Sequence, residues 1–157
     1  MAGLAPWAGM SLGRAGSPNS RLQHACVGVG GMGWNDLQNF LQHARTQVVA
    51  LCDVDANALK RAAEAVPGAR TYSDWREMLA QEGARIDSVN VAVPDHMHAA
   101  IAMAAVRRGK HVYCQKPLCH DVAEIRALTK AARKAGVVTQ LGTQIASSVT
   151  DRSVVQL

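Results

Sequence analysis

The chain has 157 residues and a formal net charge of +5, with 48% hydrophobic and 18% charged residues. This length and composition are typical of one globular domain with a sizeable core, and no apolar run approaches the roughly 20 residues of a membrane span. The basic residues are scattered over expected helix surfaces, and the three Trp, two Tyr and one Phe do not interleave with them. The sequence therefore predicts neither a nucleic-acid partner nor a membrane partner.

Residues 1–20, "MAGLAPWAGMSLGRAGSPNS", are rich in Gly, Ala, Ser and Pro. We expect a flexible tail, because Pro6 and Gly9 interrupt the apolar part and the first basic residue is Arg14, unlike the order found in a secretory signal. The alternative is the remnant of an export signal whose start is missing. The first interpretation predicts a cytoplasmic protein and the second a periplasmic one.

Four cysteines stand at positions 26, 52, 114 and 119. Three of them lie in apolar, strand-like runs, where a thiol behaves as a small hydrophobic group. No CxxC pair occurs, so we expect neither a metal site nor a redox pair, but reduced and mostly buried thiols in a reducing compartment.

From Arg21 onward, short strand-type runs alternate with longer runs of helical spacing. The strands are expected at 24–30, 47–53, 86–93, 111–114 and 137–142. The helices are expected at 34–44, at 55–66, after Asp74, from Asp95 to Gly109 and from Asp121 to Gly136, with Asp55, Asp74, Asp95 and Asp121 as N-caps. Strands that are apolar on both faces and alternate with helices predict an α/β fold, a doubly wound parallel sheet with helices on both faces. Ligands bind such sheets at the carboxyl ends of the strands.

The first expected strand leads into "GVGGMG", in which Gly28, Gly30 and Gly33 have the GxGxxG spacing. Gly28 permits a tight turn, Gly30 lets the backbone approach a pyrophosphate, and Gly33 lets helix and strand pack closely. Gly31 and Met32 complete the turn, and the helix after it points free N–H groups at the phosphates. We expect all five residues to bind the cofactor.

Asp53 stands twenty residues beyond Gly33, at the end of the next expected strand. Strand, glycine turn, helix and acidic residue together are far more specific for a dinucleotide than the glycines alone. The Asp53 carboxylate can accept hydrogen bonds from both ribose hydroxyls and would repel a 2′-phosphate, so NAD is favoured over NADP. Helix capping is the alternative role, for which Asp55 is better placed.

"GVGGMG", "ALCDVD", "PDHMH" and "CQKPL" follow one another along the chain. In this order and spacing, the stretch from Leu22 to about Gln144 resembles the N-terminal domain of the glucose–fructose oxidoreductase/inositol dehydrogenase (Gfo/Idh/MocA) family. The resemblance implies an NAD(P)-binding Rossmann domain over 21–145, which serves an oxidoreductase that removes hydride from a hydroxyl-bearing carbon of a sugar, cyclitol or related polyol. It also implies that 146–157 begin a truncated second α+β domain, and that the full-length protein is a homo-oligomer.

The family's usual Glu-Lys-Pro is Gln115-Lys116-Pro117 in this chain. By position, the resemblance places Lys116 beside the nicotinamide and in contact with the reacting hydroxyl. Our hypothesis is that Lys116 takes or relays the hydroxyl proton, because an uncharged Gln115 favours the neutral amine more than a carboxylate would. The alternative is a surface lysine that covers a strand end. The peptide bond before Pro117 can be cis or trans.

Val93, Pro94, His96 and Gln115 complete the expected cofactor contacts at the strand ends. The resemblance suggests that His98 lines the nicotinamide or substrate space as a second catalytic residue, and the alternative is a helix-start histidine bonded to local backbone. We expect both histidines to be neutral, because the positive end of a helix dipole disfavours imidazolium.

Since the second domain has no counterpart in the sequence, we expect a fragment that binds dinucleotide and does not turn over substrate alone. The alternative is a non-catalytic dinucleotide-binding module, a sensor or a regulator. A domain for S-adenosylmethionine is a third option, in which "CQKP" has no evident use.

Overall fold

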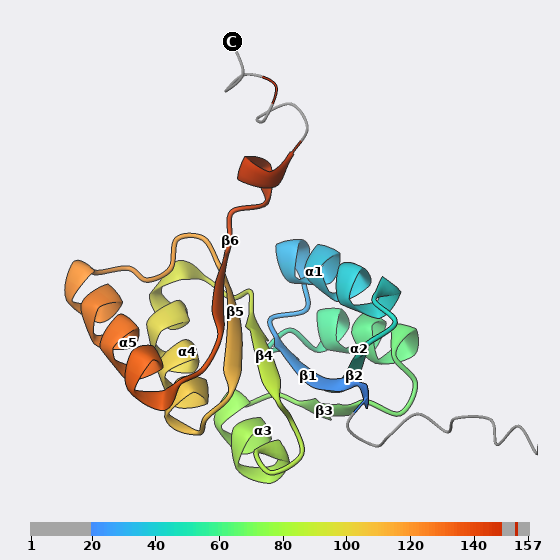
Figure 1. Ribbon diagram of the computed structural model, residues 1–157. Helices are drawn as coiled ribbons and strands as arrows, with labels where there is room; N and C mark the ends of the chain where they lie inside the picture. Colours follow the sequence, from blue (N-terminus) through green and yellow to red (C-terminus); the bar gives the residue numbers. More distant parts are fainter. Residues whose placement is uncertain (1–19, 149–152, 154–157) are drawn as a thin grey trace, which may run out of the picture.

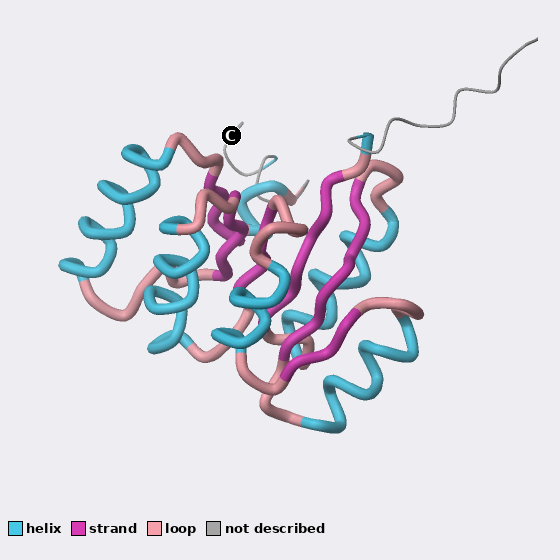
Figure 2. Tube along the Cα trace, turned by 90° about the horizontal axis from the view of Figure 1, so that it is seen from below, coloured by secondary structure: helices cyan, strands magenta, loops and turns pink. Residues whose placement is uncertain are grey.

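The computed structural model describes residues 20–148 and 153. The expectations for 1–19, 149–152 and 154–157 lie outside these residues. In the described part, one parallel sheet has the strand order β3-β2-β1-β4-β5-β6, and helices cover both of its faces (Figures 1 and 2). The predicted doubly wound α/β fold is confirmed. No described helix is long and apolar enough to cross a membrane.

The strands are β1 (Leu22–Val27), β2 (Thr46–Cys52), β3 (Arg70–Tyr72), β4 (Ser88–Val91), β5 (His111–Gln115) and β6 (Thr139–Gly142). The α-helices are α1 (Gly31–Gln42), α2 (Ala56–Ala65), α3 (Trp75–Glu82), α4 (His98–Arg107) and α5 (Val122–Ala135). Two short 3₁₀ turns, η2 (Asp95–Met97) and η3 (Gln144–Ser147), follow β4 and β6.

The hydrophobic core has two layers, one on each face of the sheet. Leu37 of α1 and Ala62 of α2 pack with Cys26 and Leu51 on one face. The helices α3, α4 and α5 pack on the other face, where the larger core cluster lies. All four cysteines are free and buried, as expected, and burial raises the pKa of the Cys52 and Cys114 thiols to about 12.

Three of the four predicted N-caps are confirmed. Asp55, Asp74 and Asp121 each accept a backbone N–H of the first helical turn, and Asp121 forms the capping box with Glu124. The prediction for Asp95 is wrong. The Met97 N–H donates to the carbonyl of Pro94 at 2.9 Å, which closes a 3₁₀ turn, so that α4 begins only at His98.

Two further elements differ from the sequence prediction. The helix α1 begins at Gly31 rather than at Trp34, because the Trp34 N–H already donates to the carbonyl of Gly30 at 3.2 Å. The short strand β3 was not expected, since three residues are too few for a periodic pattern. The Asp53 N–H donates to the carbonyl of Tyr72 at 3.2 Å and extends the pairing of β3 with β2.

Candidate functional site

The glycine turn joins β1 to α1, and two of its glycines are required by close packing. Gly28 has φ +82°, and a Cβ there would lie 2.2 Å from the carbonyl oxygen of Ala92. A Cβ on Gly33 would lie 2.1 Å from the carbonyl oxygen of Gly28. At Gly30 the nearest atom to an added Cβ is the Ala58 Cβ, at 3.5 Å. Gly28 therefore allows the left-handed turn and Gly33 the close helix–strand packing, while the backbone at Gly30 is open to a ligand.

The Asp53 carboxylate holds the glycine turn directly. Its Oδ2 accepts the Val29 N–H at 2.8 Å and its Oδ1 accepts the Asp55 N–H at 2.9 Å. Each carboxylate oxygen keeps a further lone pair for a second donor. Asp53 does not cap α2, whose N-cap is Asp55. That Asp53 stabilises the glycine turn through these hydrogen bonds was not predicted from the sequence.

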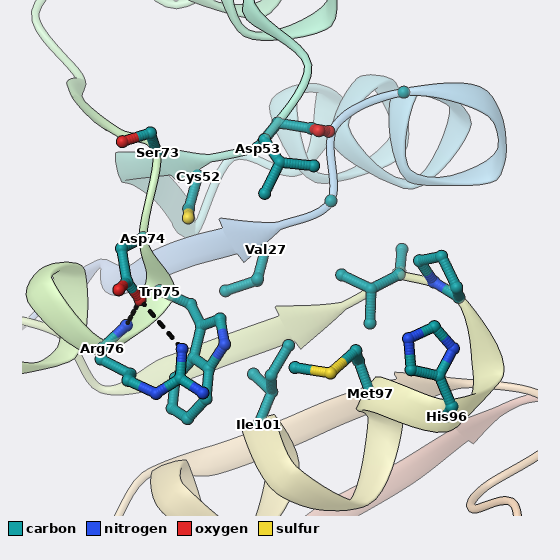
Figure 3. Close-up of a pocket in the computed structure, with 16 residues that line it drawn as sticks. Val27, Cys52, Asp53, Ser73, Asp74, Trp75, Arg76, His96, Met97 and Ile101 are labelled. Carbon is teal, nitrogen blue, oxygen red and sulfur yellow. Dashed lines mark hydrogen bonds and ion pairs between the residues drawn. The ribbon is translucent and has the colours of Figure 1, made fainter.

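A cavity of about 600 Å³ opens at the carboxyl ends of β1, β2 and β4 (Figure 3). It collects six of the residues predicted to bind the cofactor, namely Gly28, Gly30, Asp53, Val93, Pro94 and His96. Val27 and Cys52 contribute apolar lining, and Met97 and Ile101 lie across from Asp53 (Figure 3). The cavity is within the size range of small-molecule sites, about 300–1,000 Å³. Gly31 and Met32 are exposed at the start of α1 and do not line it.

Four lining residues come from the loop after β3 and the start of α3, and sequence reasoning missed them, namely Ser73, Asp74, Trp75 and Arg76. Asp74 pairs with Arg76 at 3.5 Å, and the Arg76 guanidinium lies 4.4 Å from the centroid of the Trp75 ring. Figure 3 shows this group on the wall beside Ser73. The signal was available, since strand ends supply ligand contacts in this fold, but it required recognition of β3.

Lys116 lies outside this cavity, on the segment that follows β5. Its side chain is exposed, and no described residue forms a hydrogen bond or ion pair with it. Gln115, immediately before it, is buried, and the peptide bond between Lys116 and Pro117 is cis.

His98 is 1% exposed and connects the ends of two strands. Its Nδ1 lies 2.5 Å from the carbonyl oxygen of Pro117, and its Nε2 lies 2.8 Å from that of Val93. These are backbone contacts of the kind that the alternative interpretation predicts. A neutral imidazole can donate to only one of the two carbonyls. The catalytic role of His98 stays a prediction.

The buried side chain of Gln115 faces a carboxylate. Its Nε2 donates to both oxygens of Asp36 on α1, at 2.8 and 3.0 Å. Gln144 and Asn90 donate to the same carboxylate at 3.4 and 3.5 Å. Burial raises the pKa of the Asp36 carboxyl, and the three amide hydrogen bonds oppose that rise. Gln115 stands where the family usually has a glutamate, and the structure places the carboxylate of Asp36, 79 residues away in sequence, against it.

Known proteins are similar to this chain in sequence and in fold. The family model GFO_IDH_MocA, described as an oxidoreductase family with an NAD-binding Rossmann fold, matches residues 22–143. D-apiose dehydrogenase of Paraburkholderia graminis is 32% identical over 117 residues, which cover 74% of this chain and 31% of that protein. Inositol 2-dehydrogenase of an Arthrobacter species is 30% identical over 116 residues, covering 73% and 34%. The chain thus spans about a third of the length of these two relatives.

The structural comparison agrees. The WlbA dehydrogenase of Bordetella pertussis, solved in complex with NADH and UDP-GlcNAcA, matches with a TM-score of 0.78 and 29% identity over 85% of this chain and 38% of that chain. The family model covers most of the chain, including the glycine turn, Asp53 and Lys116. The chain therefore belongs to the Gfo/Idh/MocA oxidoreductase family and carries its NAD-binding Rossmann domain.

Proposed function

We propose that residues 21–145 bind NAD as the nucleotide-binding domain of an oxidoreductase that oxidises a hydroxyl of a sugar, cyclitol or related polyol. The observation that supports it most is the joint position of Gly28, Gly30 and Asp53 on one cavity at the switch between β1 and β4. Relatives named D-apiose dehydrogenase and inositol 2-dehydrogenase support the substrate class. In this proposal the chain binds the cofactor and requires a further domain for turnover.

The residues present fit a dinucleotide. The open backbone at Gly30 and the start of α1 would take the pyrophosphate, because free N–H groups and the positive end of the helix dipole meet there. The Asp53 carboxylate would accept the ribose hydroxyls with its remaining lone pairs. The bound nicotinamide would supply the hydride acceptor. Lys116 Nζ, free of any described partner, would take or share the proton of the reacting hydroxyl.

We expect NAD to bind the chain at least about tenfold more tightly than NADP. The 2′-phosphate of NADP would be repelled by the Asp53 carboxylate, and the hydrogen bond from the ribose 2′-hydroxyl to that carboxylate would be lost. Isothermal titration calorimetry with both nucleotides measures the ratio. Asp53→Asn should reduce it, because the amide keeps an acceptor and loses the charge. Glu64→Gln, at an exposed site on α2, is the control and should leave the ratio unchanged. Tighter binding of NADP by the unaltered chain would refute the assignment.

We expect Lys116→Ala to lower turnover by about 100-fold in a protein that joins this domain to a substrate domain, because a positioned proton acceptor is lost. The affinity for NAD should stay within about threefold, since Lys116 does not line the cavity that contains the glycine turn and Asp53. Steady-state kinetics and calorimetry on the same preparations separate the two effects. Lys130→Ala on the exposed face of α5 is the control. Unchanged turnover would instead favour the non-catalytic module, which needs the cavity and has no use for the amine.

A further inference from the structure

A carboxylate without a cationic partner lies against the strand end that carries Lys116. Asp36 is 5% exposed, and in the described part of the chain no Lys, Arg or His forms an ion pair with it. A buried carboxylate is costly unless hydrogen bonds replace its hydration. Asp36 is therefore held by its amide donors alone.

These donors come from three different parts of the sheet. Gln115 ends β5, Asn90 lies within β4, and Gln144 follows β6. The two bonds from Gln115, at 2.8 and 3.0 Å, are the shortest of the set, and those from Gln144 and Asn90 are 3.4 and 3.5 Å long. Gln115 is the one donor of this set that lies on β5, so its two charge-assisted bonds to Asp36 connect α1 to the end of that strand.

Lys116 stands between two residues that are fixed from opposite sides. Before it, the Gln115 side chain is bonded to Asp36. After it, the carbonyl of Pro117 is bonded to the ring of His98, at 2.5 Å. The Lys116 side chain itself has no described partner and is exposed. The direction in which it leaves the backbone is thus set by its neighbours.

We propose that Asp36 is a positioning residue, which holds Gln115 and thereby fixes Lys116 relative to the glycine turn. The helix α1 that carries Asp36 begins at Gly31, in that same turn, so one rigid element joins the expected phosphate site to the expected site of proton transfer. The proposal rests on the proposed function, in which Lys116 reaches the bound nicotinamide. It predicts that the contact can be reversed: a carboxylate at 115 and an amide at 36 should hold the end of β5 in the same place.

The test uses the 157-residue chain with Asp36→Asn, with Gln115→Glu and with the double replacement D36N/Q115E, and with Glu64→Gln on exposed α2 as the control for lost charge. Acetylation of Lys116 by an N-hydroxysuccinimide ester is measured by peptide mass spectrometry, with and without NADH. The exposed Lys130 of α5 is the internal reference. Affinity for NADH is measured by calorimetry on the same samples.

In the unaltered chain, NADH should slow the acetylation of Lys116 relative to Lys130 by roughly tenfold. The reason is that a nicotinamide bound beside a fixed Lys116 amine would keep the ester from reaching it in a reactive geometry. Asp36→Asn and Gln115→Glu should each change the ratio of the two rates without NADH and remove most of the protection. NADH affinity should stay within about threefold in Asp36→Asn, because the cavity is untouched. D36N/Q115E should restore both the ratio and the protection.

Each other outcome has a distinct meaning. If NADH binds the unaltered chain without protecting Lys116, the proposed place of Lys116 in the site fails, while the ratio without NADH and its restoration still decide the role of Asp36. If Asp36→Asn leaves the ratio and the protection unchanged, Asp36 does not position the lysine. If affinity and protection fall together and the double replacement does not restore them, Asp36 supports only the general integrity of the fold, and the proposal is overturned.

Discussion

Gly33→Ala is expected to destabilise the chain by at least about 3 kcal/mol, the upper part of the range for overpacked sites. The added Cβ would lie 2.1 Å from the carbonyl oxygen of Gly28 and 3.1 Å from the Cβ of Ala92. The first of these atoms belongs to backbone, so relief requires α1 to move away from the end of β1. Unfolding in urea, followed by circular dichroism, measures the shift in midpoint and slope.

Gly136→Ala provides the matched control for this substitution. Gly136 ends α5 with φ +65°, and an added Cβ there would meet no atom within 4 Å. The cost should be only the strain of a left-handed residue, about 1–2 kcal/mol. Equal losses in the two variants would show that the glycine turn tolerates a side chain, which would contradict the packing described for it.

Acid is expected to destabilise the chain through His24 by about 3 kcal/mol between pH 7 and pH 4. The ring is 2% exposed, its centroid lies 4.2 Å from that of Phe40, and its Nδ1 is 2.6 Å from the Ser88 hydroxyl. Among the described residues its Nε2 has no hydrogen-bond partner, and burial lowers the pKa of His24 from 6.5 to about 4. An unfolded chain takes up this proton below pH 6.5, whereas the folded chain does so only near pH 4. The contribution of neutral His24 to the free energy of unfolding is therefore complete above pH 6.5, falls as the pH decreases, and is lost below about pH 4.

Urea unfolding at several pH values tests this, with the double replacement H24L/S88A as the comparison. Removing both partners of the hydrogen bond leaves no unpaired hydroxyl in the core. The difference in unfolding free energy between the two proteins should change by about 3 kcal/mol from pH 7 to pH 4. For His120→Gln, at an exposed site, the difference in unfolding free energy from the unaltered chain should not change in this way. A constant difference across this range would contradict the environment assigned to His24.

The sequence was sufficient for features that depend on neighbouring residues. Side-chain caps such as Asp55 and Asp121 act within one helical turn, and the apolar runs of β2 and β4 identify buried strands from their own composition. Asp95 is the case in which this local reasoning fails. Aspartate is a common N-cap residue, but here the Met97 N–H donates to the Pro94 carbonyl and closes a 3₁₀ turn, so the helix does not begin at Asp95. Whether a cap is used depends on a competing backbone hydrogen bond that composition does not reveal.

The missed parts of the site depend on contacts between distant segments. Gly28 and Asp53 were found because their spacing is fixed by one strand–helix–strand unit. Asp36 meets Gln115 across 79 positions, and Trp75 reaches the cavity only because β3 pairs with β2. Neither contact has a local pattern. Each depends on strand order, which is known only once the sheet is assembled.

The two hydrogen bonds of Asp53 limit how the coenzyme preference of this domain can be re-engineered. Exchanging the residue for a small or basic one would admit a 2′-phosphate, and would also release the Val29 and Asp55 amides that the carboxylate now anchors. A variant in which Asp53 is exchanged to favour NADP is therefore expected to hold the glycine turn less rigidly as well. A basic residue at Val54, which is 92% exposed beside Asp53, would add attraction for the phosphate and leave the anchor in place.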